Sequence, residues 1–163
     1  MIEAINWLIE EHVSVINMSL AGPDNAILKA VINAALEQGV FIIAAAGNEG
    51  PAAAAVFPAG YQDVIAVSAI DQNQQPYRWS NQGSHIDYAA LGVNVLTAQF
   101  QDRTGRESGT SMAAPVVAAA LACIVASVPE FSRSQIMSAL AAKAIDLGPI
   151  GKDPIFGLGA IQP

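Results

Sequence analysis

Two short apolar runs, Val40–Ala46 (VFIIAAA) and Val64–Ile70 (VIAVSAI), limit the folds open to this sequence. A strand covered on both faces reads as a continuous apolar run, whereas a half-exposed strand alternates apolar and polar residues. Segments whose apolar residues have helical spacing alternate with strand-like segments along the chain. This alternation predicts an α/β fold of three layers, with a mostly parallel sheet flanked by helices.

The other elements are predicted from apolar periodicity, turn residues and helix caps. Asp24 or Asn25 caps a second helix, and Gly39 fits the left-handed position after it. Pro115 is expected in the first turn of a long helix that follows Thr110 and Ser111. Asp71–Gly109 is a long irregular stretch of the kind that lines a site or wraps an edge. The predicted strands are Val13–Leu20, Val40–Ala46, Val64–Ile70 and His85–Ala90, and the predicted helices are a short one at the start, 26–38, 112–128 and about 133–143, the last with a Ser132–Gln135 capping box.

Composition narrows the classes of protein. The chain has 163 residues, 53% hydrophobic and 13% charged, which fits one domain over residues 1–163 and excludes a disordered chain. The net charge is −7 and no two basic residues are adjacent, so we expect no nucleic-acid partner. Cys123 is the one cysteine, which excludes an intramolecular disulfide and a multi-cysteine metal site.

The sequence gives no reason to expect a membrane partner. Met112–Val128 carries no charge, but it is short for a membrane span, rich in alanine and contains a proline near its beginning. We therefore interpret it as a buried helix. The start, Met1–Glu11, carries three glutamates and no early positive charge, unlike a secretory signal peptide.

Two segments carry groups suited to catalysis. In Gly109–Pro115 (GTSMAAP), Ser111 stands at the mouth of the apolar helix, where free N–H groups and the helix dipole favour a developing oxyanion. In Ala44–Gly50 (AAAGNEG), Asn48 follows a buried strand and offers an amide donor to a crevice. Each segment alone has a simpler interpretation, a helix cap at Thr110 or Ser111 and an ordinary turn at Asn48.

Taken together, VINMSL, AAAGNEG and GTSMAAP, in this order, resemble the catalytic domain of subtilisin-like serine proteases. The resemblance extends to Val64–Ile70 after Phe57-Pro58 and to Phe156–Gly159, and it covers nearly the whole chain. It implies that Ser111 is the nucleophile that attacks the scissile carbonyl. It also implies that Asn48 is the side-chain donor of the oxyanion hole, together with the backbone N–H of Ser111.

The resemblance further implies a substrate cleft and a cis bond between Phe57 and Pro58. The segment Ser19–Gly22 would pair with the substrate backbone as an extended strand. Val56 stands where the family often has glycine, so we expect a shallow pocket that prefers small or medium apolar side chains. Val116 and Ala119 also depart from the family pattern and are expected to affect packing only. The implied substrate-binding residues are Ser19, Leu20, Ala21, Gly22, Ala45, Ala46, Gly47, Val56, Gly109 and Thr110.

The Asp-Thr-Gly and His-Gly-Thr segments, which supply the aspartate and histidine of the family's mechanism, do not occur in this sequence. His12 precedes the first strand, some 25 Å from the expected crevice. His85 lies in the irregular stretch, which the resemblance places on the outside of the domain. We therefore expect an N-terminally truncated, partial catalytic domain that is inactive by itself. Its partner would be the missing N-terminal segment or a second copy of the chain, paired through the long apolar edge of the first strand.

Three further expectations remain open at this stage. The resemblance implies structural calcium, with the strongest family site largely in the missing part. A weaker calcium or sodium site is conceivable at the carbonyls of Ala59, Tyr61 and Val64, although no side-chain metal motif is present. The family favours secretion, but the compartment is undetermined. The alternative function is a non-catalytic peptide-binding module, whereas a dinucleotide-binding domain is excluded because no G-x-G-x-x-G follows the first strand.

Overall fold

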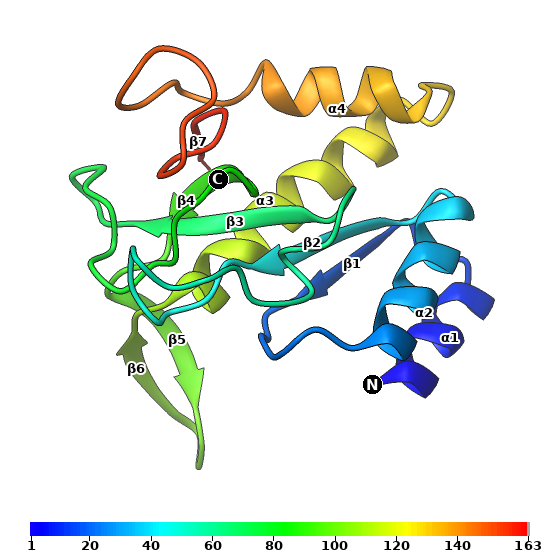
Figure 1. The fold of residues 1–163 in the computed structure, drawn as a ribbon, viewed down its shortest axis with the longest axis horizontal. Helices are drawn as coiled ribbons and strands as arrows, with labels where there is room; N and C mark the ends of the chain where they lie inside the picture. The colour runs from blue at the N-terminus through cyan, green and yellow to red at the C-terminus, as the bar shows by residue number, and fades with distance from the viewer. Residues whose placement is uncertain (163) are drawn as a thin grey trace.

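The computed structural model describes residues 1–162 of the chain. At its centre is a five-stranded sheet in which all neighbours run parallel, in the order β1-β2-β3-β4-β7 (Figure 1). A two-stranded antiparallel hairpin, β5 and β6, projects away from it. The elements are α1 (Ile2–Glu10), β1 (Val15–Met18), α2 (Ala26–Glu37), β2 (Phe41–Ala45), β3 (Ile65–Ile70), β4 (Ile86–Leu91), β5 (Val95–Gln99), β6 (Arg103–Glu107), α3 (Thr110–Ser127), α4 (Arg133–Ala141) and β7 (Ala160–Ile161).

The sheet separates two apolar cores, as the continuous apolar runs predict. On one face, Ile43 and Val67 belong to a core that includes buried residues of α3 and α4. On the other face, Ile42 packs in a core with Ile5 of α1 and Ile32 of α2. The predicted three-layer α/β fold with a parallel sheet is therefore confirmed, and one side of α3 packs in its core, although this helix is also long and apolar enough to cross a membrane.

Several local predictions are also confirmed. Asn25, and not Asp24, caps α2, since its side chain accepts hydrogen bonds from the N–H groups of Ile27 and Leu28. Gly39 has a φ of 86°, the left-handed conformation expected after the helix. The capping box of Ser132 and Gln135 is present, and the peptide bond between Phe57 and Pro58 is cis.

The stretch Asp71–Gly109 is less irregular than predicted, because it contains the β5–β6 hairpin as well as β4. Neither hairpin strand has the buried alternate residues that mark a strand in sequence. Its turn uses Gln101 and Asp102 with φ of 60° and 55°, where a glycine or asparagine would have signalled the turn. The two-residue β7 was also missed, since so short a strand has no sequence period.

Two boundaries differ from prediction in ways that matter for the site. β1 is four residues long, so the free edge of the sheet is shorter than the long edge predicted from Val13–Leu20. The helix α3 begins at Thr110 with Gly109 as N-cap, which places Pro115 inside the helix rather than in its first turn. The prediction for Pro115 was wrong because it assumed that Thr110 or Ser111 caps the helix. The hydroxyl of Thr110 instead bonds to Gly47 and Asn48, and the helix starts at Thr110 with no side-chain cap.

Candidate active site

The candidate site forms where the carboxyl ends of β1 and β2 meet the first turn of α3. Ser19 follows β1, Asn48 follows β2, and Ser111 is the second residue of α3. The N–H of Gly109 donates to the carbonyl of Gly92 at 2.8 Å, which ties the mouth of α3 to the residue that follows β4. The fold thus brings together three segments that are far apart in the chain, at the end of the sheet where α/β proteins place their ligands.

Ser111 is held where a helix exposes unbonded N–H groups. As the second residue of α3, it has an N–H with no carbonyl one turn back inside the helix. Its hydroxyl is part-buried and donates to the carbonyl oxygen of Ser19 at 3.3 Å. The simpler interpretation of Ser111 as a helix cap is wrong, because the N-terminus of α3 has no side-chain cap.

Thr110 fixes the orientation of the Asn48 amide. The Oδ1 atom of Asn48 accepts from the backbone N–H of Thr110 at 2.9 Å and from its hydroxyl at 3.2 Å. The Thr110 hydroxyl accepts in turn from the N–H of Gly47 at 3.1 Å, and the threonine is fully buried. With the Asn48 oxygen occupied in this way, its NH₂ group remains as the donor. An asparagine that only formed a turn would not need its amide fixed in this orientation.

Gly109 gives Asn48 room to pack directly over the N-terminus of α3. A Cβ at residue 109 would lie 3.3 Å from Nδ2 of Asn48 and 3.4 Å from its Oδ1. The contact with Nδ2 is tighter than most Cβ contacts, so the Asn48 amide would have to move by a few tenths of an ångström to make room for a side chain. Gly109 therefore belongs to the site through its small size, as does Thr110 through its hydrogen bonds.

Some of the residues predicted for the substrate cleft lie beside one another. Gly22 forms an antiparallel bridge with Phe57, the neighbour of Val56, through two hydrogen bonds of 2.9 Å. A Cβ at Gly47 would lie 2.8 Å from Cγ2 of Val56, so Val56 contacts the turn that carries Asn48. Next to Leu20, Ala21 and Gly22 lies an apolar hollow of about 280 Å³ that also involves α1 and α2.

Ala45 and Ala46 contribute differently from Gly47. Their side chains are 2% and 0% exposed, and Ala45 belongs to the core that faces α3. Only their backbone is therefore available to a ligand. Their small size lets the sheet approach α3 closely, which is the packing role that the sequence pattern of a buried strand indicates.

Asn81, which sequence reasoning did not single out, holds the turn that carries Asn48. Its side chain is completely buried, accepts from the N–H of Glu49 at 2.8 Å and donates to the carbonyl of Ala54 at 3.3 Å. Its backbone N–H donates to the carbonyl of Gly47 at 3.1 Å. In sequence, Ser80–Gly83 has the composition of a surface turn, so nothing in the pattern indicated a buried amide.

Replacing Asn81 with alanine should destabilise the protein by about 1–3 kcal/mol, because two part-buried hydrogen bonds, from the N–H of Glu49 and to the carbonyl of Ala54, lose a fully buried partner. Urea unfolding followed by circular dichroism measures this free energy. The matched control is Asn73→Ala, at an exposed residue of the preceding turn, with an expected change under about 0.5 kcal/mol. Equal effects of the two substitutions would contradict the role given to Asn81.

Neither histidine of the chain reaches Ser111. His12 lies before β1 and Ser19 after it, so the two are at opposite ends of that strand. His85 lies just before β4, whereas Gly92, which bonds to the mouth of α3, follows the same strand. Burial lowers the pKa of His85, although nearby Asp87 acts in the opposite direction. The site as described therefore has a candidate nucleophile and oxyanion donor without a histidine base.

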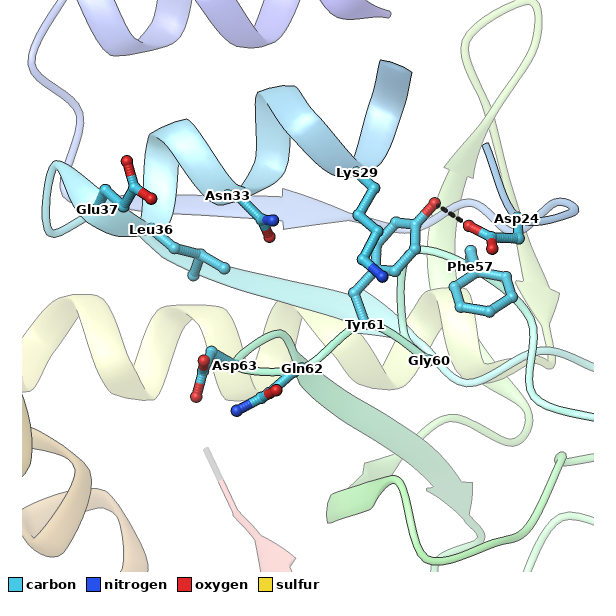
Figure 2. Close-up of a pocket in the computed structure, with 10 residues that line it drawn as sticks. All are labelled: Asp24, Lys29, Asn33, Leu36, Glu37, Phe57, Gly60, Tyr61, Gln62 and Asp63. Carbon is cyan, nitrogen blue, oxygen red and sulfur yellow. Dashed lines mark hydrogen bonds between the residues drawn. The ribbon is translucent and has the colours of Figure 1, made fainter. Parts of the chain in front are cut away.

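A second, polar hollow of about 540 Å³ lies between α2 and the loop that follows Pro58 (Figure 2). The hydroxyl of Tyr61 donates to Asp24 at 2.9 Å, and Nζ of Lys29 lies 5.7 Å from the centre of the Tyr61 ring. Ser19, Asn48 and Ser111 do not line this hollow. Within residues 1–162, no three His, Cys, Asp or Glu side chains are grouped so that they could hold a metal ion.

Fold and site together define a class: an α/β domain with a serine at the mouth of a core helix and an oriented amide donor beside it. The model of the subtilase family matches residues 1–159, so the chain belongs to the subtilase family. It is 34% identical over 163 residues to the minor extracellular protease Epr of Bacillus subtilis, covering 99% of this chain and 25% of that protein. It is 38% identical over 151 residues to subtilisin E of Bacillus subtilis, covering 90% and 40%.

Two solved structures have the same fold. A lanthipeptide protease superposes with a TM-score of 0.89 at 23% identity, covering 98% of this chain and 62% of that one. The prenylagaramide maturation protease PagA superposes with a TM-score of 0.85 at 26% identity, covering 99% and 63%. The chain therefore spans between a quarter and two thirds of the length of these relatives.

Proposed function

We propose that this chain is the nucleophile-bearing portion of a subtilisin-like serine endopeptidase. The observation that carries the proposal is the pairing of Ser111, at the mouth of α3, with an Asn48 amide whose oxygen is occupied by Thr110. This leaves two donors, the Asn48 NH₂ and the Ser111 N–H, for the same oxyanion. Membership of the subtilase family supports the assignment of a peptide or protein substrate.

In the proposed reaction, Oγ of Ser111 attacks the carbonyl carbon of the scissile peptide bond, and the carbonyl oxygen becomes an oxyanion bound by the two donors. The C–N bond then breaks, which gives an acyl-enzyme on Ser111 and an amine that must take up a proton. Water hydrolyses the acyl-enzyme and regenerates the serine. A base is needed to accept the hydroxyl proton and deliver it to the amine. The carbonyl of Ser19, which accepts a hydrogen bond from this hydroxyl, is too weakly basic for this task.

We propose that the histidine base and its aspartate come from a polypeptide segment outside these 163 residues, and that the chain alone is inactive. The test is intact mass after treatment with an organophosphorus serine-hydrolase probe, with Ser111→Ala as the control. Slow or absent labelling of the chain alone is expected. Rapid labelling that the substitution abolishes would contradict inactivity, because some base within the chain would then activate Ser111.

The alternative function, a peptide-binding module without catalysis, is favoured by one observation, the distance of both histidines from Ser111. Such a module needs the cleft border at Ser19–Gly22 but has no use for an oriented oxyanion donor. The two proposals differ when a base is supplied. If the chain is part of a protease, the organophosphorus probe then labels Ser111. If it is a binding module, Ser111 stays unlabelled and the chain still binds peptides.

One face of α3 is apolar and exposed, which supports the proposal that another polypeptide segment covers it. The helix has no charged residue, yet Ala119, Ala122 and Cys123 are exposed, and a hollow of about 460 Å³ lies along this face. A helix that is apolar all round is normally buried on all sides. We propose that the N-terminal segment of the catalytic domain covers this face and pairs with the free edge of β1. A second copy of the chain is the alternative, and light scattering distinguishes a dimer from a monomer that awaits its partner.

Val56 should limit the size of the substrate side chain that precedes the cut. In the complex with its N-terminal segment, peptidyl phosphonates with Ala, Val or Leu at this position should label Ser111 faster than those with Phe or Tyr. Val56→Gly should change the ratio by about tenfold in favour of the aromatic side chains, since it enlarges the pocket. Equal labelling by all probes before and after the substitution would contradict the proposed pocket.

We also propose a weak structural cation site at the carbonyls of Ala59, Tyr61 and Val64. Carbonyl oxygens suit calcium or sodium, and the adjoining hollow carries Asp24, Glu37 and Asp63, although Lys29 opposes a cation there. Millimolar calcium should raise the melting temperature by a few degrees, on the order of the shift that one kcal/mol produces. An unchanged melting temperature in calcium and in sodium, relative to choline, would contradict the site.

A further inference from the structure

The helix α3 has a gap in its hydrogen bonding directly at the candidate nucleophile. In an α-helix the carbonyl of Ser111 would accept from the N–H of residue 115. That residue is Pro115, which has no N–H, so the carbonyl lacks its usual donor one turn further along the helix. The hydroxyl of Ser19 supplies one, and donates to the carbonyl oxygen of Ser111 at 2.9 Å.

The Ser19 hydroxyl is itself oriented from the strand side. The side-chain Nδ2 of Asn17, on β1, donates to Oγ of Ser19 at 3.0 Å. This contact uses a lone pair of the oxygen and leaves its proton to point at Ser111. A chain of two hydrogen bonds thus runs from β1 through Ser19 to the backbone of α3.

Ser19 and Ser111 are joined a second time, in the opposite sense. The Oγ of Ser111 donates to the carbonyl oxygen of Ser19 at 3.3 Å. The backbone and the side chain of Ser111 are therefore both hydrogen-bonded to Ser19, which is 92 residues away in the sequence. Both contacts are part-buried, so water competes for them less than it would at the surface.

We propose that Ser19 is a positioning residue for Ser111, in addition to any contact its backbone makes with substrate. Its hydroxyl replaces the helix hydrogen bond that Pro115 removes, and so fixes the first turn of α3 relative to the cleft border. The proposal rests on the proposed function, in which Ser111 is the nucleophile. Small displacements of a reacting atom cost large factors in rate, which gives this contact its value.

The contact can be measured in the chain alone by nuclear magnetic resonance, without any activity. The carbonyl ¹³C of Ser111 is read through the N–H of Met112, and its chemical shift reports the hydrogen bond at that carbonyl. Ser19→Ala should move this resonance upfield, whereas Ser19→Thr, which keeps the hydroxyl, should leave it near the parent value. An unchanged resonance in a folded Ser19→Ala variant would overturn the proposal.

Pro115→Ala tests the reason for the contact. An alanine at this position has an N–H that faces the Ser111 carbonyl, so Ser19→Ala should shift the resonance much less in this background than in the parent. An equal shift in both backgrounds would mean that Ser19 does not compensate for the proline. This comparison also separates the effect at the carbonyl from a general loosening of the fold.

The role in positioning is tested by phosphonate labelling of the complex with an N-terminal subtilase segment. Ser19→Ala should lower the labelling rate about fivefold, the value of one ordinary hydrogen bond, and Ser19→Thr should restore most of it. Labelling of Ser19→Ala at the parent rate would overturn the positioning role. A parent complex that does not label at all would instead contradict the proposed function, so the two failures are distinguishable.

Discussion

Co-expression of this chain with the N-terminal part of the subtilisin E catalytic domain should raise the rate at which Ser111 reacts with an organophosphorus probe by at least about 10³. The reason is that in the chain alone the Ser111 hydroxyl donates a hydrogen bond to the Ser19 carbonyl, which is not a base that can remove its proton. In subtilisin itself, removal of the catalytic histidine lowers kcat by roughly 10⁶, so supplying a histidine can raise the rate by a large factor. Intact mass against time measures the rate.

Two controls give this experiment its meaning. The same segment with its catalytic histidine changed to alanine should bind without accelerating the reaction, and Ser111→Ala should remain unlabelled with either segment. Light scattering shows whether a one-to-one complex has formed. Formation of the complex with no gain in labelling would contradict the proposal that a base supplied from outside completes the site. Equal gain with the alanine segment would show that the base lies in this chain.

Sequence reasoning performed well where a residue's role follows from local pattern. The strands β2 and β3 were predicted because burial on both faces excludes polar residues from them, and Gly39 because a helix end needs a left-handed residue. Ser111 and Asn48 were singled out by the family resemblance, which rests on the order and spacing of three motifs. The strands and Gly39 are encoded within a few consecutive residues, whereas the assignment of Ser111 and Asn48 needs all three motifs together.

The missed features depend on contacts between distant segments. Asn81 lies in a stretch that reads as a surface turn, and only its burial against the Gly47–Gly50 turn gives it a role. Pro115 was expected in the first turn of α3, because the two hydrogen bonds that the Thr110 hydroxyl makes with Gly47 and Asn48 cannot be predicted from the helix sequence alone. The shortness of β1 has the same kind of cause, since Ser19 leaves the sheet to bond with Ser111.

Substitution of Asn48 should lower the rate of acylation by about 10²–10³ in the complemented enzyme, the magnitude known for loss of this donor in subtilisin. Asn48→Ala removes the NH₂ donor, but it also leaves the N–H of Thr110 without its acceptor. Asn48→Asp separates the two effects, because a carboxylate still accepts from Thr110 while it repels the oxyanion. We therefore expect Asn48→Asp to lose at least as much rate as Asn48→Ala.

The distribution of the loss between kcat and KM decides what Asn48 does. A donor that acts on the oxyanion is used only in the transition state, so kcat for a peptide substrate should fall while KM stays near the parent value. Thr110→Val, which removes the hydroxyl that orients Asn48, should give a smaller loss of the same kind, and Thr110→Ser should retain most of the rate. If KM rises and kcat is unchanged, Asn48 binds the ground state, and its oriented amide is then part of a peptide-binding cleft rather than of an oxyanion hole.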